Sequence, residues 1–221
     1  METTKPSKKP NRRFRNGSRF NKNKKNDQPR DGLVKNTSFQ GLTRTVGMDC
    51  EMVGVGDKGT QSILARVSLV NQFGHCLYDK YVKPTEPVTD YRTSVSGIRP
   101  EDIENGEDFK KVQYDVNDII KGRILVGHAL KNDLKVLFLD HPRSRIRDTS
   151  VYFKKMLKGG GKPSLKRLTS QLLGVDIQHG EHDSVQDARA AMRLYTMYKK
   201  KWESEIKSRH KPQKSKSKKK E

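Results

Sequence analysis

The sequence has only two cysteines, Cys50 and Cys76, among its 221 residues. Their separation matches no metal-ligand spacing, so the sequence predicts no cysteine-based metal site. Both cysteines lie in strand-like stretches, which indicates reduced, buried thiols in an intracellular protein. The chain also lacks an apolar run long enough to cross a membrane, and its N-terminus lacks the apolar core of a signal peptide. We therefore expect no membrane partner.

Acidic residues are scarce at the two ends of the chain. Residues 1–30 carry a net charge of +9 and residues 199–221 a net charge of +8, whereas residues 31–198 carry only +4. The ends also lack apolar periodicity, so we predict a basic disordered arm at 1–43, a folded domain at 44–200 and a basic disordered tail at 201–221. Two such arms favour a polyanionic partner, above all nucleic acid, over simple solubility tails.

Apolar patterning predicts the order of elements in the body of the chain. We expect strands at 46–55 and twice within 63–83, a loop at 84–103, a helix at 110–122, a strand at 123–128 and a helix at 130–139. A strand leading into a helix follows at 146–153. Within 159–174 we expect a glycine hinge and then a helix that opens around Pro163 and Ser164, and the final helix lies at 184–202. Three hairpin-linked antiparallel strands followed by strand–helix alternation indicate an α/β fold. An RNase-H-like mixed sheet, with parallel strands added to the antiparallel ones and helices on its faces, fits this order.

Two carboxylates interrupt the first predicted strand, "TVGMDCEMVGVG" (45–56). Because strand side chains alternate between faces, Asp49 and Glu51 share one face and Cys50 takes the other. Two buried like charges repel unless a cation lies between them, and Mg²⁺ or Mn²⁺ suits carboxylate oxygens. The alternative for this stretch alone is an edge strand with two solvated acids.

Two later segments supply further acidic side chains. Asp133 lies near the start of the helix after "ILVGH", where Gly127 is expected to let the backbone turn, and ligands collect at such strand ends. In "GEHDSVQDARA" (180–190), Asp183 or Ser184 caps the final helix, which brings His182 and Asp187 within reach of one pocket. Taken singly, Asp133 is also compatible with a helix-dipole role, and 180–190 with a surface loop.

Together these motifs resemble the DEDDh exonucleases. The stretches "MDCEMVG", "LYDKYVKP", "VTDYRTSVSGI", "VGHALKNDLKVL", "DTS", "PSLKRL" and "HDSVQDARAAMRLY" are similar to the group of RNA exonuclease 4 and the interferon-stimulated 20 kDa exonuclease. The similarity covers about residues 44–198, and the placement of the basic arms is nearest to the RNA exonuclease 4 branch. "GGGKPS" (159–164) is not a P-loop, because Pro163 follows the lysine where Ser or Thr is needed.

The resemblance implies 3′–5′ hydrolysis of RNA to nucleoside 5′-monophosphates with two divalent ions, Mg²⁺ or Mn²⁺. It implies that Asp49 bridges both ions, that Glu51 and Asp187 complete the ion holding the attacking water, and that Asp133 serves the other. His182 is then the general base, since imidazole titrates near neutral pH. His128 is interpreted as structural.

Substrate contacts and cellular role are weaker implications of the same resemblance. Met52 is expected to pack on the terminal base or sugar, and Arg92 to contact the ribose. We expect a monomer that binds RNA, with pre-ribosomal RNA or particles as the target, in the nucleus and its nucleolus. Two alternatives stay open: a DNA exonuclease of repair, and a non-catalytic ribosome-assembly factor, which would not need four acids and a histidine.

Overall fold

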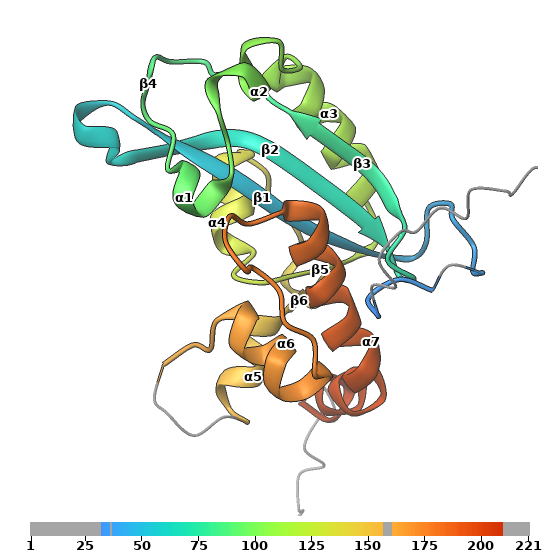
Figure 1. Cartoon of the computed structure of the whole chain (residues 1–221). Coiled ribbons are helices and arrows are strands. Elements are labelled where there is room, and N and C mark those ends of the chain that lie inside the picture. The colour runs from blue at the N-terminus through green and yellow to red at the C-terminus, as the bar shows by residue number, and fades with distance from the viewer. Residues whose placement is uncertain (1–31, 36, 157–160, 210–221) are drawn as a thin grey trace, which may run out of the picture. The chain divides into compact units, whose positions relative to one another are not determined.

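The structure is a computed structural model that describes residues 32–35, 37–156 and 161–209 (Figure 1). Its centre is a six-stranded sheet in the order β3-β2-β1-β5-β6, with β4 paired to β1 outside this path. The strands are β1 (Thr45–Val55), β2 (Gln61–Asn71), β3 (Cys76–Tyr81), β4 (Val88–Asp90), β5 (Ile124–Gly127) and β6 (Ile146–Asp148).

The sheet is mixed, as the sequence predicts. β1 pairs antiparallel with β2, and β2 with β3, whereas β5 and β6 continue the sheet parallel to β1. The β2–β3 turn is fixed by Asn71, whose side-chain oxygen accepts hydrogen bonds from the backbone N–H groups of Phe73 and His75. Gly74 follows at φ 91°, a conformation that glycine adopts without strain. The predicted RNase-H-like α/β class is therefore confirmed.

Helices bury both faces of the sheet. They are α1 (Thr93–Ser96), α2 (Pro100–Glu104), α3 (Phe109–Ile120), α4 (Lys131–Val136), α5 (Thr149–Lys154), α6 (Leu165–Leu173) and α7 (Ser184–Arg209), with short 3₁₀ turns at Asp57–Gly59 and Arg143–Arg145. Apolar residues of α3 and α4 share one core cluster with β1 and β2, and those of α5, α6 and α7 share another with β5. The sheet thus lies between two helical layers.

The segment 84–103, predicted as a loop, holds three short elements. It contains β4, α1 and α2, which close over the far end of β1 around a small core that includes Val53, Ile98 and Ile103. The prolines of this segment led to the loop prediction. Pro100 is nevertheless compatible with a helix, because it occupies the first turn of α2, where its missing N–H costs nothing.

The prediction for 130–139 was wrong in its length and in one inward residue. The helix α4 ends at Val136, and Leu130, Leu134 and Leu137 are buried as expected. Phe138 instead lies outside the core, 79% exposed, with a backbone φ of 50°. The left-handed backbone at Phe138 ends the helix and turns this ring away from the face that the leucines bury.

Both predicted domain boundaries need correction. The helix α7 runs to Arg209, so residues 201–209 are helical and not a disordered tail. Trp202 is buried and stacks on Tyr152 of α5 with ring centroids 3.8 Å apart, which anchors this extension. At the other end, Leu33 is buried in the same core, so 32–35 and 37–43 are not a disordered arm either. Residues 1–31, 36 and 210–221 lie outside the described residues. So do residues 157–160, which include Gly159 and Gly160 of the tri-glycine.

The structure also bears on the two cysteines and on membrane-spanning helices. Cys50 is a buried free thiol as expected, but Cys76, at the start of β3, is an exposed free thiol. In the part of the chain that the structure describes, no helix combines the length and apolar character that a membrane crossing requires.

Candidate active site

The carboxylates of β1 face the layer formed by α7. Asp49 lies opposite Ser68 of β2, and the hydroxyl of Ser68 contacts the hydroxyl of Ser184, the first residue of α7, at 2.6 Å. Glu51 shares this face and lies opposite Arg66. The register then shifts directly after Glu51, a β-bulge of the kind often found beside active sites.

Gly47 lets α7 approach β1 closely. A Cβ at this position would lie 2.9 Å from a methyl of Val70 and 3.1 Å from the backbone oxygen of Ala188 in α7. Gly47 also stands two residues before Asp49, on the same strand face. The absence of a side chain therefore sets how near the first turns of α7 come to the acidic pair.

Asp187 reaches the site because the start of α7 is firmly capped. The side chain of Asp183 accepts a hydrogen bond from the N–H of Gln186 at 3.0 Å, and its backbone oxygen accepts one from the N–H of Asp187 at 2.9 Å. Of the two predicted caps, Asp183 is the one that the structure uses. Asp187 is thereby held in the first turn of α7, buried against β1.

His182 lies in the loop before α7, next to Asp187. Its Nδ1 is 3.6 Å from a carboxylate oxygen of Asp187, and its backbone N–H donates to the oxygen of Val95 in α1 at 2.8 Å. One ligand atom each from Glu51, His182 and Asp187 lie within 4.8 Å of one another. The structure therefore brings together three of the five residues that the sequence singled out.

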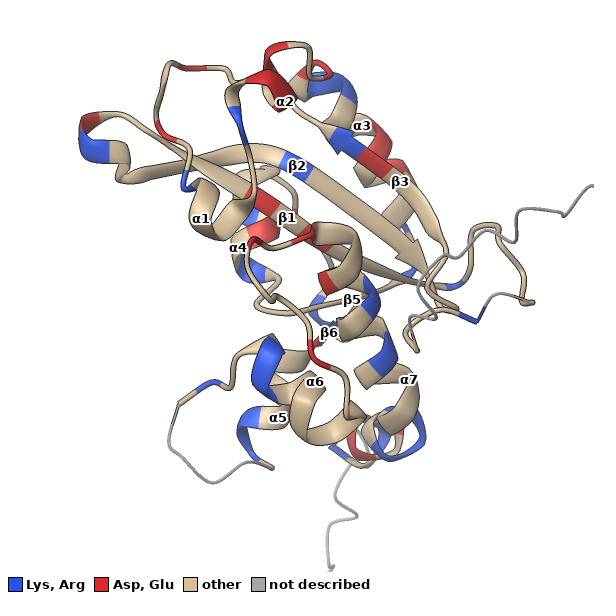
Figure 2. Cartoon of the chain, viewed as in Figure 1, with Lys and Arg blue, Asp and Glu red and all other residues tan. Residues whose placement is uncertain are grey.

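Asp133 approaches the same acids from α4. It is buried, it receives hydrogen bonds from Cys50, and its charge acts on Asp49. Glycine is needed at position 127 because of close packing and not because of its backbone torsion angles. A Cβ there would lie 2.4 Å from a side-chain atom of Leu130. The left-handed turn falls on Ala129 at φ 60°, whose N–H donates to Asp148. In Figure 2 the acidic positions of β1, α4 and the start of α7 lie toward one another.

Burial raises the pKa of all four carboxyl groups, and the charges of neighbouring carboxylates add to the effect. Burial, followed by the charges of Asp133 and Asp187, raises the pKa of Asp49 well above its ordinary value. Burial and the Asp187 charge raise the pKa of Glu51 to about 8, and burial raises the pKa of Asp133 to about 7 and of Asp187 to about 6. The site therefore stores electrostatic repulsion that a bound cation would relieve.

Two oxygens in the cluster point to a cation directly. Glu51 Oε1 and Asp187 Oδ1 are buried and, within the described residues, have no hydrogen-bond partner. Arg66, whose positive charge acts on Glu51, is engaged by Asp79 through two hydrogen bonds of 2.8 Å. Buried carboxylate oxygens without donors are the ligands that a hard divalent ion prefers, so these residues fit a metal site.

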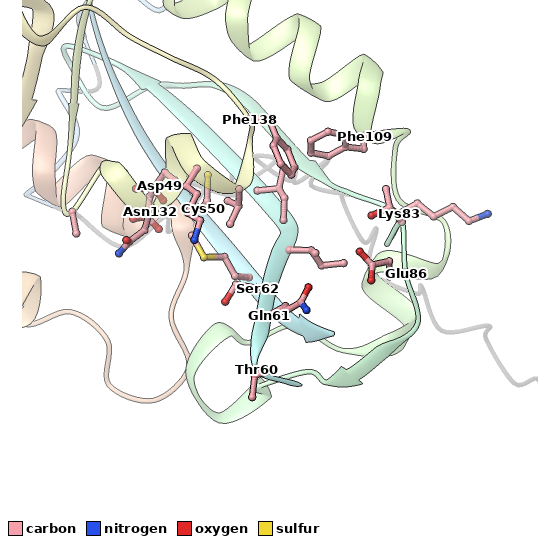
Figure 3. Close-up of a pocket in the computed structure, with 18 of the residues that line it drawn as sticks. Asp49, Cys50, Thr60, Gln61, Ser62, Lys83, Glu86, Phe109, Asn132 and Phe138 are labelled. Atoms are coloured by element: carbon pink, nitrogen blue, oxygen red, sulfur yellow. The ribbon is translucent and has the colours of Figure 1, made fainter. Parts of the chain in front are cut away.

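A cavity of about 940 Å³ adjoins the carboxylates (Figure 3). Asp49, Cys50, Asp133 and the half-buried Met52 line it, and its wall continues along residues 60–64 of β2 and the turn before it. Figure 3 shows the rings of Phe109 and Phe138 beside each other on the same cavity. The sequence-predicted Met52 thus lies beside the acids, in a space of the size that small ligands occupy.

Arg92 lies next to this cavity but is held by protein groups. Its guanidinium donates to the hydroxyl of Ser62, a cavity residue, at 2.8 Å and to the backbone oxygen of Gly59 at 2.7 Å. Its backbone has φ 51° and its N–H donates to Asp90. The structure therefore ties Arg92 to the β1–β2 connection, and its contact with a ribose stays a prediction.

Sequence patterns did not indicate two other residues of the site. Gln178 donates a 2.6 Å hydrogen bond to the Asp187 oxygen that also faces His182. Lys166 of α6 acts on His182 by its positive charge, which adds to burial in lowering the pKa of that imidazole. Gln178 has φ 55°, a backbone strain that no sequence pattern reveals.

His128, interpreted as structural from the sequence, forms a hydrogen bond with the hydroxyl of Thr149 at 2.9 Å and borders the cavity.

Comparison with known proteins connects this geometry to one enzyme family. Residues 46–195 match the family described as "Exonuclease" (RNase_T). The chain is 66% identical over 180 residues to RNA exonuclease 4 of Xenopus laevis, covering 80% of this chain and 42% of that protein. It is 63% identical over 179 residues to the Homo sapiens protein of that name, with coverage of 80% and 42%. The protein of that name from Saccharomyces cerevisiae is 50% identical over 175 residues, with coverage of 78% and 61%. The chain thus spans less than two thirds of the length of these relatives.

Solved structures give the same fold. The Saccharomyces cerevisiae Pan2 pseudoubiquitin hydrolase–RNA exonuclease module in complex with AAGGAA RNA superposes with a TM-score of 0.65 at 33% identity, covering 76% of this chain and 30% of that chain. The catalytic unit of Neurospora crassa Pan2 gives a TM-score of 0.64 at 28% identity, covering 82% and 32%. These domains share the sheet and helix arrangement on which the carboxylate cluster stands.

Proposed function

Because the chain belongs to the exonuclease family, we propose that it hydrolyses RNA from the 3′ end and releases nucleoside 5′-monophosphates. One observation carries this proposal: Glu51, Asp187 and His182 converge within 4.8 Å, and two buried carboxylate oxygens there lack hydrogen-bond donors. A purely structural role does not explain why a strongly basic chain concentrates unpaired acids at one point.

We assign the metal ligands to the four carboxylates Asp49, Glu51, Asp133 and Asp187, which would hold two divalent ions, Mg²⁺ or Mn²⁺. The raised pKa values and the unpartnered oxygens of the cluster support this assignment. Ions bound there would acidify a water molecule and offset the negative charge on the scissile phosphate. Cys50 and Gln178 would orient two of the ligands, Asp133 and Asp187, through the hydrogen bonds that they donate.

His182 is assigned the role of general base. Burial and the charge of Lys166 lower its pKa, so the ring is neutral at pH 7 and can accept a proton. The adjacent Asp187 then lies where it stabilises the imidazolium that forms. The one-third exposed position of the ring, in a loop beside the cluster, leaves room for substrate to reach it.

RNA is the preferred substrate in this proposal, with Met52 placed against the terminal nucleotide and Arg92 near its ribose. The names of the similar proteins and the RNA in the Pan2 complex support RNA, whereas DNA remains the alternative substrate. We further propose pre-ribosomal RNA as the target, a monomeric enzyme, and a place in the nucleus and nucleolus. The basic ends of the sequence, with net charges of +9 and +8, favour these polyanionic surroundings.

The test is product analysis on matched 5′-labelled RNA and DNA strands with Mg²⁺, Mn²⁺ or chelator. We expect metal-dependent shortening of RNA by single nucleotides, abolished in Asp49→Asn. His182→Ala should lose catalytic rate far more than RNA affinity. Near-normal cleavage by Asp49→Asn would refute the metal assignment, and equal losses of rate and affinity in His182→Ala would refute the base role. Preferred cleavage of the DNA strand would move the enzyme to the alternative substrate class.

A further inference from the structure

Phe138 is an aromatic residue in an unfavourable position. Its side chain is 79% exposed, and its backbone φ of 50° lies in the left-handed region that bulky residues avoid. An ordinary helix end would place glycine or asparagine at such a residue, because these adopt the conformation with less strain. A strained and solvated phenylalanine therefore suggests a task outside folding.

The surroundings hold this ring in one place. Phe109 and Phe138 meet in a T-shaped contact, with ring centroids 5.9 Å apart. From α3, the side-chain amide of Gln113 donates to the backbone oxygen of Leu137 at 2.8 Å and to that of Phe138 at 3.5 Å. The backbone is thus clamped while the ring stays exposed, an arrangement that presents an aromatic face to a ligand.

Phe138 also borders the cavity that Asp49 and Asp133 line. Figure 3 shows Phe109 and Phe138 on one part of it and Asp49 on another. Asp133, Lys83, Lys135 and Glu86 also line it. Aromatic faces beside lysines are the usual means of holding single-stranded nucleic acid, because every base stacks and every phosphate attracts a cation.

We propose that Phe138, supported by Phe109, stacks on a base of the RNA strand whose reacting end lies at the carboxylates. This inference rests on the proposed function, and it adds a base-binding subsite separate from Met52 and Arg92. Stacking accepts any base, so the subsite would raise affinity without imposing a sequence preference.

The experiment compares RNA affinity and hydrolysis in Phe138→Ala with those in Tyr114→Ala. Tyr114 is a matched control because it is 72% exposed on α3 but does not line the cavity. We expect Phe138→Ala to weaken RNA binding by about 5- to 100-fold and to raise KM with little change in kcat, as loss of one stacked base predicts. Tyr114→Ala should match the wild type.

Two further measurements separate stacking from misfolding. Phe138→Gly should be at least as stable as the wild type, because glycine relieves the left-handed strain, yet should lose the same affinity. Phe138→Trp should retain it. A set of RNA strands, each with one abasic site at a different position, identifies the stacked base. The wild type should bind one of these strands more weakly than the intact RNA. Phe138→Ala should bind that strand and the intact RNA equally.

Wild-type affinity in both Phe138→Ala and Phe138→Gly, with RNA hydrolysis intact, would overturn the subsite and leave the exonuclease function standing. Absence of RNA hydrolysis in the wild type would instead overturn the proposed function. Additive losses from the abasic site and Phe138→Ala would show that this ring and that base do not meet.

Discussion

Replacing Glu51 by glutamine should stabilise the protein in the absence of metal while destroying its proposed activity. Glu51 is 6% exposed and its Oε1 has no hydrogen-bond donor among the described residues. Burial, together with the charge of Asp187, raises its pKa from 4.5 to about 8, although Arg66 opposes the shift. A glutamine at this position has the same shape but carries no charge.

The direction of the pH effect follows from proton uptake. The folded protein holds the Glu51 proton up to about pH 8, whereas the unfolded chain releases it near pH 4.5. Stability therefore falls as pH rises through this window, because folding must recapture the proton or bury the charge. From the two pKa values, ionisation of Glu51 costs about 3 kcal/mol of folding free energy at pH 7, and most of that cost develops between pH 5 and pH 7.

The measurement is urea unfolding with chelator, followed by the fluorescence of Trp202, which is the sole tryptophan and is buried. The free energy of unfolding of Glu51→Gln relative to wild type should rise by about 3 kcal/mol from pH 5 to pH 8. Any loss of stability from the unpaired amide of the glutamine is the same at pH 5 and pH 8. The change with pH therefore reports only the charge of Glu51. The exposed Glu104→Gln serves as control and should follow the wild type.

Magnesium supplies a second, opposite readout. Added Mg²⁺ should stabilise the wild type, since an ion that binds only the folded state adds free energy with its concentration. Glu51→Gln should gain less because it lacks one ligand. The hypothesis that Glu51 is a destabilised carboxylate and a metal ligand has two refuting outcomes. One is the same pH dependence of the free energy of unfolding in wild type and Glu51→Gln. The other is equal stabilisation of the two proteins by Mg²⁺.

Three other predictions concern residues that are not themselves part of the acidic cluster. Arg147→Ala should lower the free energy of unfolding by about 3 kcal/mol, because it leaves Glu203 without its 2.7 Å partner, while the exposed Arg143→Ala should not. Glu181→Gln should lower kcat more than RNA affinity, since the Arg99–Glu181 pair (2.7 Å) holds the loop beside His182, and exchanging the two charges should restore the rate. Removal of 1–30 and 210–221 should weaken RNA binding and flatten its salt dependence, and unchanged binding would remove the arms from the interaction. Cutting at 200 would confound this test, because Trp202 is buried in the core and Glu203 pairs with Arg147.

Local patterning determined much of the fold and of the candidate site. Alternating and helical apolar spacing report which side of an element faces the core, so the three antiparallel strands, α3 and α7 were predictable. The acids were found because a charge inside an apolar strand, as at Asp49 and Glu51, conflicts with that pattern. The capping aspartate before Asp187 is likewise a local signal, since a cap acts only on its own first turn.

Tertiary packing alone decided the rest, because its contacts join residues far apart in sequence. The extension of α7 depends on Trp202 meeting Tyr152 and on Glu203 meeting Arg147, and no local pattern in the basic C-terminal segment predicts either contact. The same holds for Gln178 bonding Asp187 and for Cys50 bonding Asp133. Likewise, leucine spacing placed Phe138 inward, and only the left-handed turn after α4 directs its ring to the cavity, where the substrate contact is proposed.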